Sequence, residues 1–343
     1  MKLPNHILVI RLSALGDVAM LIPVLKGLLD AHPILTITII SRPFYKPLFQ
    51  SIPNCNFIEA HVYGKHKGFG LFKLAKEAKK MEIDAIADTH NVLRSKLLRF
   101  YFFLSRIPIV CLNKGRVEKK KATAPIANKK LIPLKTTHQR YADVFEKLGY
   151  SITLAQVAPL KKVQLSEKLY TLIGKHTKKL IGIAPFAAHK GKMYPLDKMK
   201  EVLRKLGNTN DYQLLLFGSK NEAKKLKTLC EGIDNNIVIA GQLELIEELN
   251  LISNLDGMLA MDSGNGHLAA LYGVPVITLW GVTHPYLGFT PFKQPRSHQI
   301  ISNRTQFPLI PTSVYGNKYP KGYKNVMTSI PVSLVVEKVR SVF

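Results

Sequence analysis

The chain has 343 residues, 46% of them hydrophobic, and a formal net charge of +26. A chain of this length is longer than one hydrophobic core usually serves, so we expect two domains. Its longest apolar runs are interrupted by Lys26 and Arg106, so we expect no membrane-spanning helix, and the first residues lack the pattern of a secretory signal.

Cysteine and histidine are distributed as in a cytosolic protein without a metal site. The three cysteines, Cys55, Cys111 and Cys230, are far apart and lack metal-ligand spacing, which is typical of reduced thiols. The eleven histidines are scattered along the chain, so we expect no bound metal.

The positive charge indicates an anionic partner, which is a nucleic acid, a membrane surface or a phosphorylated substrate. Part of the excess lies in residues 114–135, here called the basic tract, which holds eight Lys or Arg residues and one acid. A solvated loop is the ordinary explanation of such a run. The basic tract contains no aromatic residue, and this argues against single-stranded nucleic acid but not against lipid headgroups.

Strand-like and helix-like patterns alternate along the chain. In chain order, the apolar runs that predict strands are HILVIRL, LTITII, AIAD, LIGIAPF, YQLLLFG, NIVIAG, GMLAMD and PVITLWG. The amphipathic stretches that predict helices are LFKLAKEAKKM, THQRYADVFEKLG, KMKEVLRKLG, NEAKKLKTLC and PVSLVVEKVRSVF. Apolar strands between amphipathic helices indicate an α/β fold with parallel, doubly wound sheets. A pause around residues 160–178 predicts a linker between two such halves.

The first turn of the chain, RLSALGDVAM, places a single acid, Asp17, between an apolar strand and an apolar helix. An aspartate beside such a turn commonly caps the helix. It also lies at the carboxyl end of a strand, where doubly wound folds bind their ligands. A helix cap and a catalytic base are therefore both open interpretations, and one side chain can serve as both.

A second turn, MDSGNGHLAAL, follows the strand that ends at Met261. Its two glycines allow close approach of a ligand, and the helix behind them offers backbone N–H groups to a diphosphate, although such glycines also make tight turns without a ligand. A dinucleotide fingerprint expects an acid about twenty residues later, but residues 263–336 contain no Asp or Glu. The chain also lacks GxxxxGK[ST], GxSxG and HExxH motifs.

Two segments together resemble the hallmark motifs of the lipopolysaccharide heptosyltransferases, glycosyltransferase family 9. They are ILVIRLSALGDVAMLIPVLKGL near the N-terminus and MDSGNGHLAALYGVPVITLWGVTHP in the second half. The segments IDAIADTHNVLRSKLL, HQRYADVFEKLG and NVMTSIPVSLVVEKV extend the resemblance over nearly the whole chain. The resemblance implies the GT-B architecture, with two Rossmann-like domains facing each other across a cleft.

With this architecture, we expect an acceptor-binding domain over residues 1–165 and a nucleotide-sugar-binding domain over residues 166–328. Residues 329–343 are expected to form a closing helix that packs back on the N-terminal domain. The resemblance further implies an inverting transferase that needs neither a metal nor another cofactor.

The family's site residues carry over position by position. The resemblance makes Asp17 the general base and Lys192 the cation that offsets charge on the leaving diphosphate. Glu222 matches a ribose-binding acid, although an acid in the first turn of a helix is also favoured by the helix dipole. The remaining expected substrate-binding residues are Gly16, Asp262, Ser263, Gly264 and His267, and for His267 local packing is an equal alternative.

Several positions depart from the family pattern. Tyr194 replaces a tryptophan, and Ala187 and Ala188, with Lys190 close by, stand where hydroxyl residues often touch the phosphates. His284 occupies the place of a usual acid, which leaves the sugar undecided.

The resulting prediction is transfer of a heptose or related sugar, with ADP-heptose as the family's typical donor, to a lipopolysaccharide core or other lipid-linked anionic saccharide. The enzyme would work in the cytoplasm, peripherally on the inner face of the bacterial inner membrane, with the basic tract against anionic lipid or acceptor phosphate. The alternatives are another GT-B enzyme such as a nucleotide-sugar epimerase, or a basic nucleic-acid-binding protein. We expect no nucleic acid as a partner.

Overall fold

The computed structural model describes residues 3–103, 106–174 and 177–343. The chain divides into two compact units, each described here by itself. The first unit comprises Met1–Lys114 and Thr137–Ala158, and the second comprises Gly115–Thr136 and Pro159–Phe343. The division after residue 165 that the sequence predicts therefore differs from the observed one, because the basic tract belongs almost entirely to the second unit.

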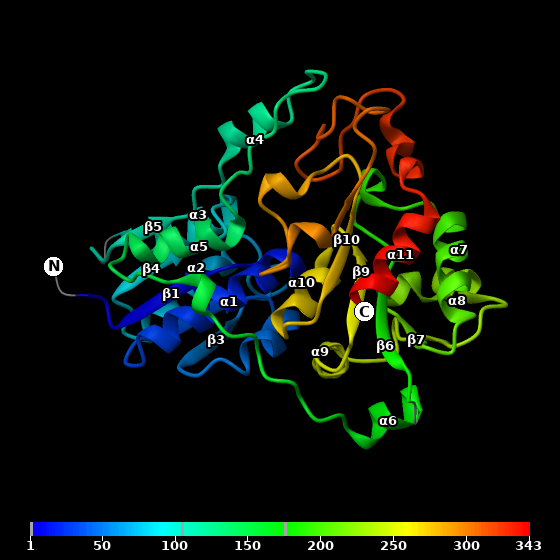
Figure 1. Cartoon of the computed structure of the whole chain (residues 1–343). Coiled ribbons are helices and arrows are strands. Elements are labelled where there is room, and N and C mark those ends of the chain that lie inside the picture. Colours follow the sequence, from blue (N-terminus) through cyan, green and yellow to red (C-terminus); the bar gives the residue numbers. More distant parts are fainter. Residues whose placement is uncertain (1–2, 104–105, 175–176) are drawn as a thin grey trace. The chain divides into compact units, whose positions relative to one another are not determined.

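The first unit is built on a parallel sheet with the strand order β3-β2-β1-β4-β5. Strand β1 pairs with β2 on one side and with β4 on the other. Helices α1 and α5 pack together on one face of the sheet, and α2 and α3 share a core on the other (Figure 1). The strands are β1 (His6–Ile10), β2 (Thr36–Ser41), β3 (Cys55–Glu59), β4 (Ala85–Asp88) and β5 (Ile109–Cys111). The helices are α1 (Leu15–Ala31), α2 (Gly70–Lys79), α3 (Leu93–Phe100) and α5 (Thr137–Glu146).

The second unit is built on a parallel sheet with the strand order β11-β10-β9-β6-β7-β8. Helices α7, α8 and α11 cover one face of this sheet (Figure 1). The strands are β6 (Lys179–Ala184), β7 (Tyr212–Leu216), β8 (Asn236–Val238), β9 (Gly257–Met261), β10 (Val276–Trp280) and β11 (Gln299–Ile301). The helices are α4 (Arg116–Ala122), α6 (Glu167–Ile173), α7 (Leu196–Gly207), α8 (Ala223–Cys230), α9 (Leu245–Ile252), α10 (Gly264–Leu271) and α11 (Val332–Val342).

Short 3₁₀ segments complete the described parts of the chain. They are η1 (Pro43–Phe49), η3 (Leu154–Gln156), η4 (Lys190–Lys192), η5 (Lys220–Glu222), η6 (Pro285–Leu287), η7 (Arg296–His298) and η8 (Tyr323–Ser329). No helix in the described ranges is both long and apolar enough to cross a membrane.

Both sheets are doubly wound, and each has one topological switch point. In the first unit the strand order reverses between β1 and β4, and in the second it reverses between β6 and β9. Loops that leave the carboxyl ends of two such neighbouring strands diverge to opposite faces of the sheet, which leaves a crevice where ligands bind. Ligand-binding residues are therefore expected directly after β1, β4, β6 and β9.

The C-terminal helix α11 belongs to the second unit and packs on that unit's own core. Its buried valines face α7 and join the core cluster of that unit. The ring of Phe343 occupies the space beside Gly257, where a Cβ atom would lie only 2.4 Å from the ring. The amphipathic pattern of α11 identified a buried face but contained no information about the surface that covers it.

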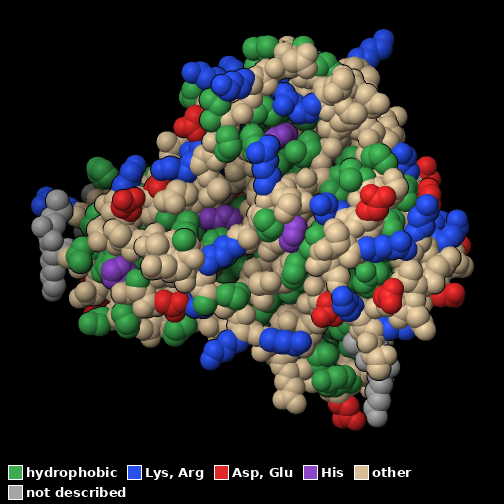
Figure 2. All heavy atoms as spheres, in the orientation of Figure 1, with side chains coloured by type: hydrophobic (Ala, Val, Ile, Leu, Met, Phe, Trp, Pro, Cys, Tyr) green, Lys and Arg blue, Asp and Glu red, His purple; other side chains and the backbone are tan. Residues whose placement is uncertain are grey.

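The basic tract is anchored to the second unit by its own cations. The Lys129 ammonium donates hydrogen bonds to three backbone carbonyls, those of Ala124 at 2.7 Å, Leu309 at 2.7 Å and Pro311 at 2.8 Å. Burial, together with the nearby charge of Arg304, lowers the pKa of Lys129 to about 8. At least one cation of the tract thus stabilises the fold. Other Lys and Arg side chains are spread over the face of the molecule shown in Figure 2.

Candidate active site

Asp17 lies in the first turn of α1 but does not cap the helix. The N-cap residue is Ala14, and Asp17 is the third helical residue, directly after the half-buried Gly16. The helix-cap interpretation of Asp17 is therefore wrong, although an acid in the first turn is still favoured by the helix dipole. The carboxylate is directed instead to a buried arginine.

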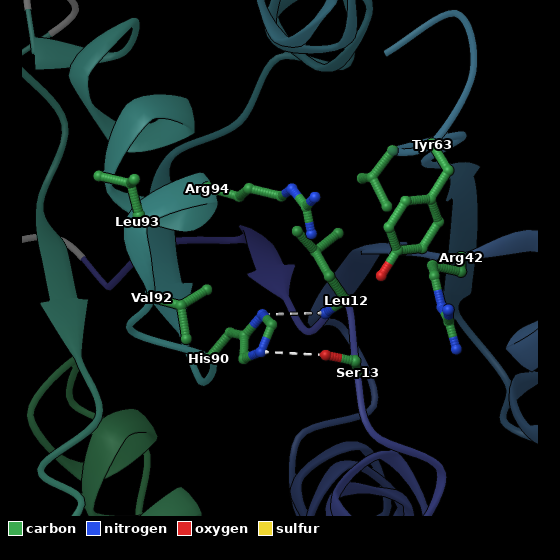
Figure 3. A pocket seen from close by; sticks show the side chains of 9 residues that line it. Leu12, Ser13, Arg42, Tyr63, His90, Val92, Leu93 and Arg94 are labelled. Atoms are coloured by element: carbon green, nitrogen blue, oxygen red, sulfur yellow. Dashed lines mark hydrogen bonds between the residues drawn. The ribbon is translucent and has the colours of Figure 1, made fainter. Parts of the chain in front are cut away.

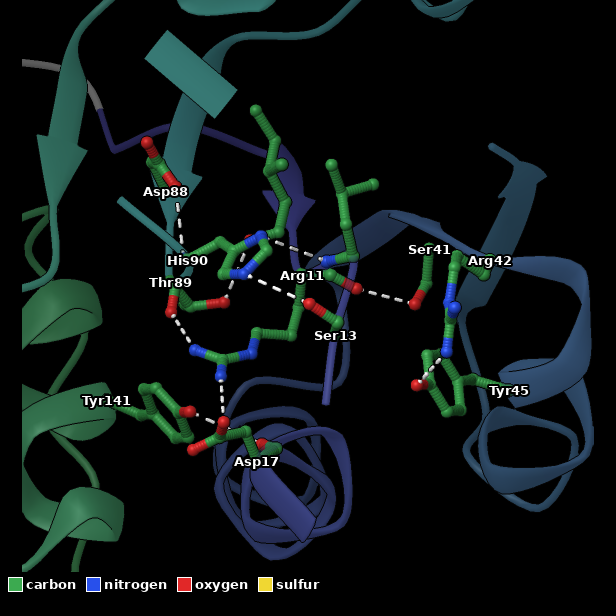
Figure 4. A network of polar contacts seen from close by, with 12 residues as sticks. Arg11, Ser13, Asp17, Ser41, Arg42, Tyr45, Asp88, Thr89, His90 and Tyr141 are labelled. Atoms are coloured by element: carbon green, nitrogen blue, oxygen red, sulfur yellow. Dashed lines mark hydrogen bonds and ion pairs between the residues drawn. The ribbon is translucent and has the colours of Figure 1, made fainter. Parts of the chain in front are cut away.

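Arg11, the first residue after β1, holds the Asp17 carboxylate (Figure 4). The Arg11 Nη2 atom lies 2.6 Å from Asp17 Oδ2, and Nη1 donates to the Thr89 carbonyl oxygen at 2.7 Å. The guanidinium lies 5.6 Å from the centre of the Tyr141 ring, whose hydroxyl donates to the Asp17 carbonyl oxygen at 3.2 Å. Loops after both β1 and β4 therefore fix this one carboxylate.

The Asp17 carboxylate keeps one oxygen available. Its side chain is 34% exposed, whereas that of Arg11 is 5% exposed. Within the described ranges, Oδ2 is taken by Arg11 and no hydrogen bond or ion pair involves Oδ1. A carboxylate that is oriented on one side and accessible on the other is suited to accept a proton.

His90 follows β4 and lies beside the same turn. The backbone N–H of Leu12 donates to His90 Nδ1 at 3.4 Å, and Nε2 lies 3.4 Å from Ser13 Oγ (Figure 3). Because Nδ1 accepts, the proton of the neutral ring resides on Nε2. Burial, with the positive charges of Arg11 and Lys114, lowers the pKa of His90 to about 3. This histidine is therefore a neutral hydrogen-bonding group and not a cation at ordinary pH.

A pocket of about 300 Å³ opens beside His90 in the first unit (Figure 3). Its lining combines two arginines with apolar and aromatic groups, and the Arg94 guanidinium lies 5.1 Å from the Tyr63 ring centre. Two guanidiniums beside a neutral imidazole suit an anionic, hydroxyl-rich ligand. The lining residues are Leu12, Ser13, Arg42, Val62, Tyr63, His90, Val92, Leu93 and Arg94.

The second unit brings Lys192 and Asp262 together at its own switch point. Lys192 ends the segment after β6, and Asp262 directly follows β9. Lys192 Nζ lies 3.3 Å from Asp262 Oδ2, and Thr283 Oγ1 donates to the same oxygen at 2.9 Å. The Lys192 side chain is 14% exposed and that of Asp262 is 9% exposed, so little water screens this pair. The pair therefore places a fixed cation and an acid together beyond the carboxyl ends of β6 and β9.

Glycines set the position of Lys192. A Cβ atom on Gly281 would lie 2.1 Å from the Gly191 carbonyl oxygen, which accepts a hydrogen bond from Val282 N at 2.9 Å. A Cβ atom on Gly316 would lie 2.3 Å from Lys192 Cγ, so the aliphatic part of the lysine side chain packs directly on the Gly316 backbone. Any side chain at these glycines must displace the η4 turn or the lysine.

Gly281→Ala is therefore expected to impair binding of a ligand at Lys192. The added methyl group must displace the Gly191 carbonyl, and overpacking of this kind costs about 1–3 kcal/mol of folding stability. If the site binds ADP, as the family resemblance implies, we expect about tenfold weaker binding of ADP by calorimetry, since a charge-assisted contact depends on the lysine position. The control is Gly64→Ala, where the new methyl group meets nothing closer than 3.8 Å. Equal ADP affinity in both variants would contradict the role of the turn.

The start of α10 lies directly beyond Asp262. Ser263 is its N-cap residue without a side-chain capping bond, and Gly264 begins the helix. His267 is buried in the same helix. Gly266 packs closely on the sheet, because its Cβ atom would lie 3.3 Å from Val276 Cγ1. The helix start thus places backbone N–H groups next to the Lys192–Asp262 pair.

Glu222 has a local structural role. Its Oε2 atom accepts from the Ser219 backbone N–H at 2.7 Å and from Ser219 Oγ at 2.8 Å. Glu222 thus has the role at the start of a helix that the sequence offered as the alternative to ribose binding. In the described ranges, no hydrogen bond or ion pair links Glu222 to Lys192 or Asp262.

The positions that depart from the family pattern also have structural explanations. Tyr194 is buried, and its hydroxyl donates to the Ile330 carbonyl oxygen at 3.0 Å. Ala187 is half-buried, and Ala188 and Lys190 are exposed. His284 is buried, and its Nδ1 atom accepts from the Tyr286 N–H at 3.1 Å. Burial, with the charge of Arg304 and other cations, lowers the pKa of His284 to about 4.

His284 makes the fold sensitive to acid. The unfolded chain binds a proton at this histidine below its ordinary pKa of 6.5, whereas the folded chain binds one only near pH 4. Its contribution to stability is therefore complete above pH 6.5 and is lost as the pH falls toward 4. In His284→Asn, the amide oxygen replaces Nδ1 and cannot titrate. We expect the pH slope of the unfolding free energy to decrease by up to about 1.4 kcal/mol per pH unit in this window. Urea unfolding across the window tests this, and an unchanged slope would contradict it.

Sequence reasoning missed three residues at these sites: Arg11, His90 and Thr283. All three directly follow or lie close after a strand, and each could have been found by listing polar residues at strand ends. What could not be read from the sequence is which of these polar residues contact one another, because Arg11 and Thr89 are far apart along the chain.

The two doubly wound parallel sheets match the GT-B fold of solved heptosyltransferase structures. The model of glycosyltransferase family 9 (heptosyltransferase) matches residues 71–321. The chain therefore belongs to glycosyltransferase family 9 and is a glycosyltransferase.

Individual proteins agree with this assignment. The chain is 25% identical over 291 residues to the lipopolysaccharide core heptosyltransferase OpsX of Haemophilus influenzae, covering 82% of this chain and 80% of that one. The glycosyltransferase family 9 structure from Veillonella parvula has a TM-score of 0.76 at 21% identity and covers 100% of this chain and 98% of its own. The ADP-heptose heptosyltransferase II of E. coli has a TM-score of 0.69 at 20% identity and 98% coverage of both chains.

Proposed function

We propose that this protein transfers a heptose from ADP-heptose to a lipopolysaccharide core or another lipid-linked anionic saccharide, with inversion at the anomeric carbon. Family membership carries the proposal, because the family model spans the segments that contain Lys192, Glu222 and Asp262. The heptose and the ADP group are taken from the names of similar proteins, which include an ADP-heptose transferase.

Asp17 acts as the general base in this proposal. The acceptor hydroxyl oxygen attacks the anomeric carbon while the bond from that carbon to the diphosphate oxygen breaks, and the hydroxyl proton passes to Asp17 Oδ1. Arg11 keeps the carboxylate oriented through Oδ2 at 2.6 Å. The observation that supports this role is the accessible oxygen of an otherwise fixed carboxylate.

Lys192 and the start of α10 stabilise the ADP leaving group. One negative charge develops on the diphosphate as the bond breaks, and a preorganised cation with adjacent backbone N–H groups lowers the energy of that charge. Asp262 holds Lys192 through an ion pair, and we propose that it also binds sugar hydroxyls. We further propose that Ser263, Gly264 and His267 contact the donor. Glu222 would bind the ribose hydroxyls in place of its present hydrogen bonds from Ser219.

The acceptor belongs to the first unit in this scheme. Gly16 and the pocket beside His90 receive the anionic saccharide, with Arg42 and Arg94 as its cationic groups. We propose that the enzyme works in the cytoplasm at the inner face of the bacterial inner membrane, because a lipid-linked acceptor resides at a membrane. Metal independence is part of the proposal, and unchanged transfer in the presence of EDTA tests it.

A thermal-shift comparison of nucleotide-sugars tests the donor. A ligand that binds only the folded state raises the melting temperature, so ADP-heptose and ADP should do so and UDP-glucose should not. A transfer assay with and without a lipopolysaccharide acceptor then tests the reaction. Donor consumption that does not depend on the acceptor would contradict a transferase, and salt-sensitive binding of DNA or RNA without a nucleotide-sugar effect would contradict the enzyme as a whole.

A further inference from the structure

Helix α3 has an apolar stripe on the side opposite its core face. Its buried residues, Ser95 and Leu98, face the sheet. Leu93, Leu97 and Phe100 follow one another at four- and three-residue spacing, which places them on one side of a helix, and all three are exposed. An amphipathic helix normally carries polar residues on its exposed side, so this stripe needs its own explanation.

Helix α2 continues the same surface. The exposed ring of Phe72 lies 5.2 Å from the ring of Tyr101, and the Phe100 ring lies 6.3 Å from the same Tyr101 ring. Phe69, three residues before Phe72, is 95% exposed, and Leu97, the least exposed of the set, is 43% exposed. We call this set the aromatic–basic face. Its apolar members are Phe69, Phe72, Leu93, Leu97 and Phe100, and the exposed cations among them are Lys73, Lys76, Arg94 and Lys96.

The residues around this face carry mainly positive charge. The stretches 63–80 and 91–103 together contain nine Lys or Arg residues and a single acid, Glu77. Lysine is depleted in protein–protein interfaces, whereas leucine and phenylalanine beside lysine and arginine are typical of helices that lie in the headgroup region of a bilayer. We propose that the aromatic–basic face docks on anionic phospholipid, with Leu97 and Phe100 entering the bilayer surface.

The face is continuous with the acceptor pocket, and this step depends on the proposed function. Leu93 and Arg94 belong to both, since they begin α3 and also line the pocket (Figure 3). A lipid-linked saccharide could thus keep its lipid in the bilayer while its anionic sugar reaches Arg94 and His90. Docking through α2 and α3 would place the pocket at the level of the headgroups.

Vesicle flotation tests the docking with the purified full-length protein, without donor or acceptor. The protein is expected to bind vesicles of phosphatidylcholine with phosphatidylglycerol and to bind phosphatidylcholine alone much more weakly. The variant L97S/F100S should bind the anionic vesicles about tenfold or more weakly, because it removes two exposed apolar side chains. The variant I126S/I132S makes a comparable change in the basic tract, where both isoleucines are exposed. The sequence predicted this tract to lie against anionic lipid, whereas the present proposal assigns lipid binding to the aromatic–basic face, so I126S/I132S should bind like the wild type.

Charge variants give a second, matched comparison. K73E/K76E changes two exposed lysines of α2, and K224E/K227E makes the same change at the same spacing on α8. Only the first pair should weaken binding to anionic vesicles.

Undiminished flotation of L97S/F100S, or equal loss in I126S/I132S, would overturn the proposal. A wild-type dimer that L97S/F100S converts to a monomer, with flotation retained, would overturn it in favour of an interface between two copies. Failure here would leave transfer to acceptor intact, so it is distinct from failure of the proposed function.

Discussion

Replacing Asp17 by asparagine is expected to lower the rate of heptose transfer by about 10²–10⁴-fold, the usual contribution of a general base. The amide has nearly the same shape as the carboxylate, and its oxygen can still accept from Arg11, which lies 2.6 Å from the present carboxylate. The network of Arg11, Thr89 and Tyr141 should therefore survive. The variant would lack only the ability to take a proton from the acceptor hydroxyl.

Three measurements separate this role from a structural one. Steady-state transfer should collapse, ADP affinity by calorimetry should remain close to that of the wild type, and the melting temperature should fall by only a few degrees, about as expected for the loss of one charge-assisted contact. Asp30→Asn makes the same chemical change in the last turn of α1, where Asp30 pairs with Lys26, and should keep full transfer activity. Full activity of Asp17→Asn would remove Asp17 from the mechanism.

The sequence predicted the sheets well where the strands are continuously buried. Strands β1, β4, β6, β9 and β10 bury nearly every residue and therefore read as uninterrupted apolar runs. The edge strands β3, β5, β8 and β11 are only partly buried, and apart from β8 they were not predicted. Short strands with a solvated side lack the continuous signal on which the other predictions depended.

For the candidate site, the sequence could predict positions but not pairings. Asp17, Lys192 and Asp262 were identified because each follows a strand or matches a family motif. The two ion pairs differ in sequence separation. Arg11 and Asp17 are close neighbours in the sequence, whereas Lys192 and Asp262 follow two different strands. The latter contact depends on strand order, since β6 and β9 are neighbours only because the sheet is doubly wound. Helix α11 shows the same dependence on tertiary packing, because its amphipathic pattern does not reveal that α7 covers its buried face.

Lys192→Met is expected to weaken ADP binding at least about tenfold, because methionine retains the apolar stem and removes the charge that would meet the diphosphate. The stem can still rest on Gly316, so the η4 turn should hold its place. Calorimetry with ADP measures the loss directly. Lys205→Met, which removes a half-exposed cation of α7 that pairs with Glu201, should leave ADP affinity unchanged.

The competing explanation is that Lys192 serves only to neutralise the buried Asp262, 3.3 Å away. A double-mutant cycle distinguishes the two roles. If neutralisation were the whole role, Lys192→Met would fail because it leaves a buried carboxylate unpaired, and adding Asp262→Asn would restore ADP binding. If the ammonium contacts the diphosphate, the double variant stays as weak as Lys192→Met, even though its melting temperature recovers. Recovery of stability without recovery of affinity is the expected result, because the amide of asparagine needs no cation but supplies none to the leaving group.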